Sequence, residues 1–241
     1  GLQCEKKLWF DVHQPIKSEK AVFEGGNRFG EQVIKNYSKD NLKVLNLTGD
    51  YVVPEKKTLE AIKSGKIDII FEAAFKYSDT LVRTDVLIRQ KDGWSLLEAK
   101  SSTKLKAEHI PDVSIQSFVV RKSLEQMGQK LSKIKLIHVN GNFILKDKGD
   151  YKGLINDDND LTERANEKDV LNYIKKLLPF TSKNSPCPKK EMGKHCKKPY
   201  DCDYKDRCKS LLPKPDVTSF TILPYIGADP KLIEYMQSKK T

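Results

Sequence analysis

The chain has 241 residues, of which 38% are hydrophobic and 32% charged, which is typical of a folded globular protein and excludes a disordered one. The longest apolar run, residues 67–75, is interrupted by Asp68 and Glu72 and is shorter than the roughly 18 residues of a membrane span. The net charge of +11 favours a polyanionic partner, either nucleic acid or an acidic membrane surface. The alternative is a basic protein that is merely soluble.

The first half of the chain has helical patterns followed by extended ones. Helices are expected over residues 2–12, 18–37 and 54–64, and the last of these has Pro54 in its first turn and Gly65 just past its end. Three strand patterns follow, over residues 67–75, 81–89 and 94–99. Lys91-Asp92-Gly93 is a hairpin turn between the last two.

The second half returns to helical patterns. Pro111 begins a helix that runs to about Met127, and Asn140-Gly141 predicts a hairpin between strands at residues 134–139 and 143–145. An amphipathic helix is expected over residues 161–178, ending before Pro179, and a capped helix over residues 229–238. Together these patterns predict an α/β protein.

The composition changes at Thr181. Residues 183–214 hold ten basic and four acidic residues and show no hydrophobic periodicity, so we expect bound metal to hold this segment together. We therefore expect a core over residues 1–180 that includes Cys4, and a cysteine-rich segment over residues 181–215 that packs on it. Residues 216–241 form a tail with a short helix, which is a candidate for the start of a further domain.

Two carboxylates are expected to meet on neighbouring strands. Asp85 and Glu98 stand thirteen residues apart, with the turn at Asp92-Gly93 roughly halfway between them. Side chains alternate along a strand, which places Glu98 and Lys100 on one face. Two close carboxylates repel unless a cation lies between them, and Mg²⁺ suits such oxygen ligands. The alternative is an ordinary charge pattern on an edge strand.

Such a site would suit phosphate chemistry. A divalent ion polarises a phosphoryl oxygen and lowers the pKa of a bound water. Lys100 beside it is a candidate for stabilising charge on the phosphate or for positioning the attacking water. Asp112 and Gln116 share one face of the next helix, and Gln116 is a candidate to reach the site, or else an ordinary solvated residue.

The order Asp85, Glu98-Ala99-Lys100 and Gln116 resembles the signature of PD-(D/E)XK nucleases in their RecB-type branch. The resemblance spans residues 4 to about 208, and is to CRISPR-associated RecB-like exonucleases and a poorly characterised bacterial family related to them. It implies a restriction-endonuclease-like α/β core with a mixed central sheet flanked by helices. It also implies a Mg²⁺- or Mn²⁺-dependent deoxyribonuclease, an exonuclease acting on single strands or ends, without a membrane partner.

The resemblance also implies roles for individual residues. Asp85 and Glu98 would bind the catalytic metal together with the Ala99 carbonyl. Lys100 would be the catalytic lysine, and Gln116 would belong to the helix motif that follows it. A nuclease core that has lost activity and only binds nucleic acid is the alternative function.

Two positions depart from the pattern of this branch. Many of its members carry a metal-binding His four residues after a Gly in the first core helix, but Gly26 is followed by Gly30 here. Glu31 and Glu72 are the candidates to replace that ligand. The helix motif is usually Gln-X-X-X-Tyr, and Val120 stands at the last position.

The five cysteines are expected to be reduced. No secretory hydrophobic segment opens the chain, so we expect a cytoplasmic protein without disulfides. Four cysteines follow the spacing Cys187-X8-Cys196-X5-Cys202-X5-Cys208. The lack of a Cys-X2-Cys pair makes a zinc ribbon less natural, but His195 keeps a Cys₃His zinc site open. Four thiolates also suit an iron–sulfur cluster.

The cysteine ligands follow from the resemblance. The stretch from Cys4 to Trp9 is similar to the N-terminal motif of RecB-like nucleases with a [4Fe-4S] cluster. This implies a cluster held by Cys4, Cys196, Cys202 and Cys208, and the rival set replaces Cys4 with Cys187. Such a clasp would stabilise the protein by about 4–5 kcal/mol, by analogy with a cross-link over a long loop. Because the chain opens inside this motif, we expect it to be a piece of a longer protein.

Overall fold

The computed structural model of the chain describes residues 2–16, 24–38, 41–165, 167–212 and 229–238. The chain divides into two compact units, one of residues 18–174 and one of residues 1–17 with 175–241. The first unit contains the sheet and the second contains the cysteines. Cys4 therefore belongs to the same unit as the cysteine-rich segment.

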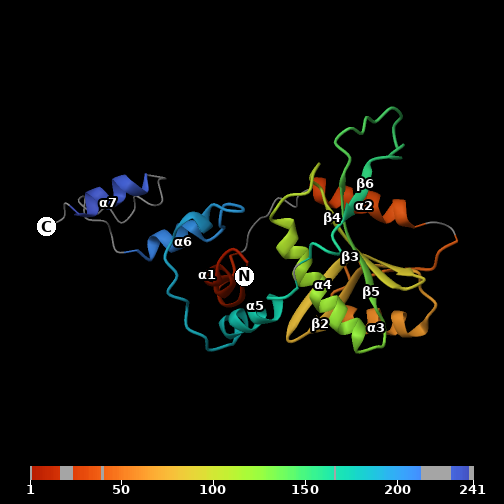
Figure 1. Ribbon diagram of the computed structural model, residues 1–241, viewed down its shortest axis with the longest axis horizontal. Coiled ribbons are helices and arrows are strands. Elements are labelled where there is room, and N and C mark those ends of the chain that lie inside the picture. Colours follow the sequence, from red (N-terminus) through yellow and green to blue (C-terminus); the bar gives the residue numbers. More distant parts are fainter. Residues whose placement is uncertain (1, 17–23, 39–40, 166, 213–228, 239–241) are drawn as a thin grey trace. The chain divides into compact units, whose positions relative to one another are not determined.

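The sheet unit is built on six strands in the order β1-β2-β3-β4-β5-β6 (Figure 1). β1 pairs parallel to β2 and β4 parallel to β5, while the other neighbours are antiparallel. The sheet is therefore mixed, and helices flank it, as expected from the sequence. The strands are β1 (Val44–Asn46), β2 (Ile69–Tyr77), β3 (Thr80–Gln90), β4 (Gly93–Lys100), β5 (Leu131–Val139) and β6 (Ile155–Asp160).

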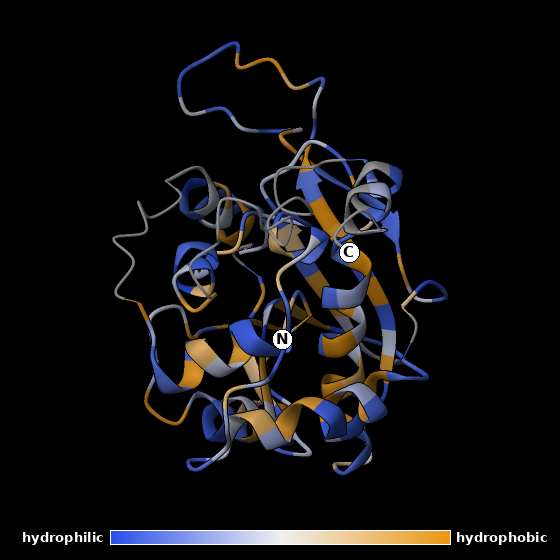
Figure 2. Ribbon diagram, turned by 90° about the vertical axis from the view of Figure 1, so that its left-hand side faces the viewer, coloured by the Kyte–Doolittle hydropathy of each residue, from blue (hydrophilic) through white to orange (hydrophobic). Residues whose placement is uncertain are grey.

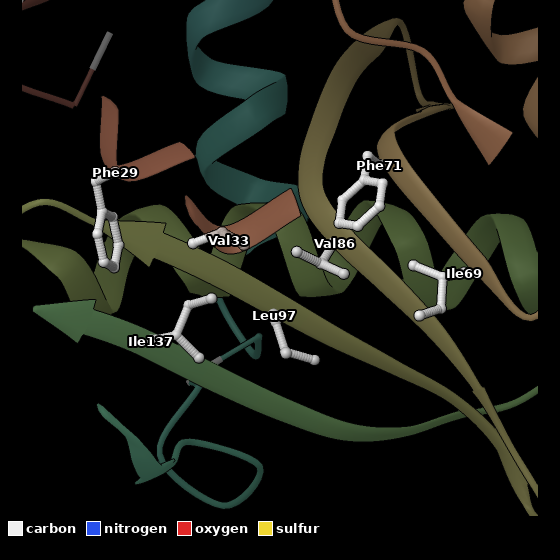
Figure 3. Close-up of a cluster of buried hydrophobic side chains, with 7 residues drawn as sticks. All are labelled: Phe29, Val33, Ile69, Phe71, Val86, Leu97 and Ile137. Carbon is white, nitrogen blue, oxygen red and sulfur yellow. The ribbon is translucent and has the colours of Figure 1, made fainter. Parts of the chain in front are cut away.

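Helices pack on this sheet because its central strands are apolar on both faces. Phe29 and Val33 of α2 join a buried cluster with Val86, Leu97 and Ile137 of the strands (Figure 3). Helix α4 contacts β2, β3 and β5, and α3 contacts β2. The helices are α2 (Glu24–Tyr37), α3 (Pro54–Ser64) and α4 (His109–Glu125), and the boundary between the two units falls within α5 (Val170–Leu177).

The turn before β4 sets the register that the site depends on. Gly93 has a φ of 138°, and a Cβ there would collide with the Lys130 carbonyl oxygen. That oxygen accepts a hydrogen bond of 2.8 Å from the Trp94 N–H. The close approach favours glycine at this position, and the resulting hairpin pairs Val86 with Leu97.

The prediction of a hairpin at Asn140-Gly141 is wrong for its second strand, because residues 143–145 form no strand. The Phe143 N–H does donate to the Asn140 carbonyl at 3.0 Å, so a local turn forms. However, the Asn140 N–H donates to the Leu154 carbonyl at 2.7 Å, and β5 pairs with β6 instead. The connection over residues 140–154 extends away from the sheet and mixes hydrophobic with hydrophilic residues (Figures 1 and 2).

The helix expected over residues 161–178 is also too long. Only α5 is helical, and Pro179 lies inside the short 3-10 helix η1 (Leu178–Thr181). Leu161 is fully buried, and Thr162 Oγ1 accepts the Ile134 N–H at 3.1 Å. Contacts with β5 therefore fix the start of this segment, which makes a single turn, with the Ala165 N–H donating to the Leu161 carbonyl at 2.9 Å.

Other helices agree with the sequence patterns. Helix α3 matches its expected range and ends at Gly65, whose φ is 66°. The first six residues of the helix expected over residues 18–37 lie outside the described residues. No helix in the described ranges is both long enough and apolar enough to cross a membrane.

The cysteine unit is a set of short helices joined by side-chain contacts. Trp9 Nε1 donates to the Ser185 carbonyl at 2.8 Å, and the rings of Phe10 and Tyr204 stack with centroids 5.0 Å apart. These contacts fasten the first helix to the cysteine-rich segment. The elements are α1 (Glu5–His13), η1, η2 (Lys194–Cys196), α6 (Lys205–Ser210) and α7 (Pro230–Ser238).

Candidate active site

A cavity of about 580 Å³ lies where α2 faces the middle of the sheet. Its lining combines acidic, amide and hydroxyl side chains with one lysine. It therefore brings together residues of β2, β3 and β4 that the sequence analysis singled out. Among its lining residues are Asn27, Gly30, Glu31, Thr48, Glu72, Asp85, Ala99 and Lys100.

Asp85 and Glu98 lie next to the point where β3 and β4 separate, and Asp85 lines the cavity whereas Glu98 does not. The last pair before this point is Val86 with Leu97, and one further step in the same register reaches Asp85 and Glu98. Beyond it, β4 continues alongside β5 alone. Asp85 Oδ2 accepts a hydrogen bond of 2.6 Å from the Ala99 N–H, which fixes the aspartate against β4.

The environment of Asp85 penalises its negative charge. Burial raises the pKa of this carboxyl well above its usual value, and the nearby Glu98 carboxylate raises it further. The hydrogen bond from the Ala99 N–H opposes the shift. A cation bound beside the two carboxylates would relieve their repulsion.

One carboxylate oxygen of Glu98 is hydrogen-bonded and the other is not. Glu98 is 5% exposed, and its Oε1 accepts a hydrogen bond of 2.8 Å from the Lys100 ammonium. Oε2 is buried and has no hydrogen-bond partner among the described residues. Burial raises the pKa of the Glu98 carboxyl, although Lys100 works against this shift. A buried acceptor without a partner is costly, so this oxygen is a candidate metal ligand.

Lys100 is bound by two carboxylates. Besides Glu98, its ammonium contacts Asp112 Oδ2 at 2.6 Å. Burial alone would lower the pKa of Lys100, but the charges and hydrogen bonds of Glu98 and Asp112 outweigh it and raise the pKa. Lys100 is therefore held as a cation. Helical spacing alone predicts that Asp112 lies beside Gln116 on one helix face, but it indicates no role for Asp112 in the site.

Helix α4 brings two further polar side chains to the same region. Gln116 lies close enough to Glu98 to lower the pKa of that carboxyl, and Gln116 Oε1 is buried without a partner among the described residues. His109, in the first turn, is buried, and its Nδ1 accepts the Lys106 N–H at 3.2 Å. Burial lowers the pKa of His109, and the charge of Lys100 lowers it further.

Glu31 and Glu72, the two candidates for a further metal ligand, differ in availability. Both line the cavity, but Glu72 Oε2 already accepts a hydrogen bond of 3.0 Å from Arg83 Nε. Glu72 also has a left-handed backbone, with φ of 55°, which interrupts the β2–β3 pairing at the position facing Asp85. Glu31 forms no ion pair with another described residue, so it is the more available of the two.

Gly30 and Val120 have different surroundings. A Cβ at Gly30 would meet nothing within 4 Å, so the missing side chain leaves open space in the cavity lining. Val120 is fully buried on α4 and belongs to the hydrophobic core. The space at Gly30 could therefore admit a larger side chain, whereas the site of Val120 is already filled.

A second pocket, in the cysteine unit, is lined by Cys4, Cys196, Cys202 and Cys208. Cys187 does not line it, whereas His195 does. Burial raises the pKa of the Cys202 and Cys208 thiols, and the neighbouring cysteines raise it further. Bound metal would favour the thiolates instead, because a coordinated thiol is deprotonated.

In the part of the chain that the structure describes, no three His, Cys, Asp or Glu side chains are grouped so that they could hold a metal ion. The Asp85 and Glu98 pair offers only two carboxylates. This number still fits Mg²⁺, which usually keeps several waters and takes one or two carboxylates from the protein. The unpartnered Oε2 of Glu98 is consistent with such a ligand.

Comparison with known proteins adds little to this geometry. No family model and no curated protein matches the chain. A solved structure described as "Crystal structure of SSO0001" is similar over 79% of this chain and 96% of that chain, with 14% sequence identity and a TM-score of 0.31. A likeness of this degree carries no argument about fold or function.

Proposed function

We propose that this chain is a metal-dependent nuclease of the PD-(D/E)XK type that hydrolyses phosphodiester bonds in DNA. One observation carries the proposal. Asp85 and Glu98 flank the last paired residues of β3 and β4, the charge of Glu98 raises the pKa of Asp85, and Lys100 is bonded to Glu98 at 2.8 Å. Two neighbouring carboxylates with a lysine bound to one of them support a metal-dependent hydrolysis of phosphodiesters.

Asp85 and Glu98 would hold a Mg²⁺ or Mn²⁺ ion, with the Ala99 carbonyl as a further ligand. When bound, such an ion polarises the phosphoryl oxygen and lowers the pKa of a coordinated water. The Ala99 N–H orients Asp85, and Lys100 holds positive charge beside Glu98. That charge would stabilise the phosphate as its negative charge grows during attack.

The substrate that fits best is a DNA single strand or a strand end. The net charge of +11 favours a polyanion, and contacts with phosphates release counterions, so binding would weaken steeply with salt. The preference for single strands or ends rests on the resemblance to RecB-like exonucleases.

We also propose that the cysteine unit holds a [4Fe-4S] cluster through Cys4, Cys196, Cys202 and Cys208. The shared pocket favours this set over the rival one, because Cys187 does not line it. The four thiolates of a cluster bind different iron atoms, so they need not converge as the ligands of a single ion do. A zinc site that includes His195 is the alternative.

A second candidate function is nucleic-acid binding without cleavage. Gly30 favours it, because this residue stands where many relatives in the proposed family carry a metal-binding histidine. In that case the chain would keep Asp85 and Glu98 but bind the metal ion too weakly for catalysis.

Cleavage assays separate the two functions. Protein purified without oxygen would be tested on single- and double-stranded DNA with and without Mn²⁺, alongside Asp85→Asn and the turn variant Asp92→Asn as control. The nuclease proposal expects Mn²⁺-dependent cleavage that Asp85→Asn abolishes and Asp92→Asn retains. DNA binding without cleavage in every protein would instead support the binding module.

A further inference from the structure

The loop over residues 47–53 carries apolar side chains that the fold leaves in solvent. Tyr51 is 82% exposed, Val52 73% and Val53 56%. Thr48, in the same loop, lines the cavity that holds Asp85. Exposed apolar side chains that gather in one place are a common mark of a binding surface.

This loop is firmly held despite its exposure. Arg83 Nη1 donates to the Asp50 carbonyl at 2.7 Å, and Nη2 donates to the Leu47 carbonyl at 2.9 Å. The side chain of Asp50 accepts the Val52 N–H at 2.9 Å and pairs with Lys57. The loop therefore presents Tyr51 from a fixed backbone, which lowers the entropic cost of binding.

Arg83 links this surface directly to the candidate active site. Its guanidinium carbon lies 5.3 Å from the centre of the Tyr51 ring, and its Nε donates to Glu72 Oε2 at 3.0 Å. Glu72 in turn lines the cavity with Asp85. One arginine thus contacts both the exposed aromatic ring and the wall of the cavity.

We propose that Tyr51, backed by Arg83, is a stacking platform for an unpaired base of the nucleic-acid strand that enters the site. This inference rests on the proposed nuclease function and specifies its substrate as single-stranded at that position. Aromatic rings and arginine together bind bases of any sequence through their faces. Lys56, whose side chain is 73% exposed beside the loop, suits the strand's phosphates.

The patch fits a base better than a protein partner. Three adjacent side chains on one loop cover far less than the roughly 800 Å² that each partner buries in a stable protein interface. A single base needs only one ring face, and Tyr51 provides one. Leu81 is 57% exposed, lies in the β2–β3 hairpin and does not line the cavity. It is therefore a suitable control position.

The test measures stacking directly, in the non-cleaving Asp85→Asn protein. A single-stranded oligothymidine carries 2-aminopurine at successive positions, and quenching of its fluorescence reports stacking on an aromatic ring. We expect quenching at one position, which Tyr51→Ala removes while weakening binding about tenfold. Tyr51→Trp should keep the quenching, and Leu81→Ala should change neither quenching nor affinity.

Several results would overturn the platform. These are unchanged quenching in Tyr51→Ala, an equal loss of affinity for blunt duplex DNA, or no binding of the oligonucleotide at all. If Tyr51→Ala dissociates a dimer in sedimentation and leaves oligonucleotide binding unchanged, the patch binds a second copy of the chain instead. If Tyr51-dependent quenching is present but the chain with Asp85 intact cleaves nothing, the platform stands and the nuclease proposal fails.

Discussion

Lys100 and Asp112 form an ion pair of 2.6 Å that joins the end of β4 to the first turn of α4. The same ammonium contacts Glu98 at 2.8 Å, so Lys100 is held between two carboxylates. One of them, Glu98, is a candidate metal ligand, and the other is not. Asp112 therefore fixes the position of the lysine independently of the metal.

Replacing Asp112 tests this positioning role. Asp112→Asn keeps the shape of the side chain and removes its charge, so Lys100 loses one of its two anchors. We expect the single-turnover rate of DNA cleavage to fall about tenfold, on the order of 1.4 kcal/mol, with DNA affinity unchanged. Asp112→Glu should restore much of the rate. An equal fall in affinity and rate would contradict a positioning role.

Much of the site could be predicted because it depends on local signals. The turn at Asp92-Gly93 and the alternation of side chains along a strand were sufficient to bring Asp85 and Glu98 together. The same rules placed Lys100 beside Glu98, where the structure has it. A pair of residues linked by one hairpin needs no knowledge of the rest of the fold.

The remaining elements depend on contacts between distant segments. Strand β6 reads Ile-Asn-Asp-Asp-Asn-Asp, which has no apolar alternation, so only its pairing with β5 makes it a strand. The short β1 likewise forms through its pairing with β2. The left-handed backbone of Glu72 and the role of Asp112 also follow from tertiary packing, which a local pattern does not specify.

Asp85→Asn should stabilise the protein when metal is absent. Burial and the Glu98 carboxylate raise the pKa of Asp85, which means that its charged form destabilises the fold at neutral pH. Asparagine removes that charge and keeps an oxygen to accept the Ala99 N–H. We expect the free energy of unfolding in EDTA to rise by about 0.5–2 kcal/mol, measured by urea denaturation. A loss of stability would show that the carboxylate is favourable without a cation.

Gly30→His would restore the histidine that the proposed family often carries. A Cβ fits at this position without a clash, and the residue lines the cavity with Asp85 and Glu31. We expect Mn²⁺ affinity to increase about tenfold, measured by calorimetry. Gly30→Ala is the matched control, because it changes helix propensity without adding a ligand, and an equal gain in that variant would count against the prediction.

Two serine substitutions distinguish the two candidate sets of cysteine ligands. Cys4→Ser should abolish the brown colour and visible absorption band of anaerobically purified protein and lower its iron content, because Cys4 lines the shared pocket. Cys187→Ser should retain both, since Cys187 lies off that pocket. The reverse outcome would favour the local set of four cysteines, and colourless protein that contains zinc would replace the cluster with a zinc site.

The most direct test of the shared cation site counts bound Mn²⁺ by electron paramagnetic resonance, which detects the free ion. We expect one Mn²⁺ bound per chain, lost in both Asp85→Asn and Glu98→Gln and retained in Asp92→Asn. If both site variants bind Mn²⁺ as the unaltered chain does, Asp85 and Glu98 do not share a cation and the nuclease proposal fails.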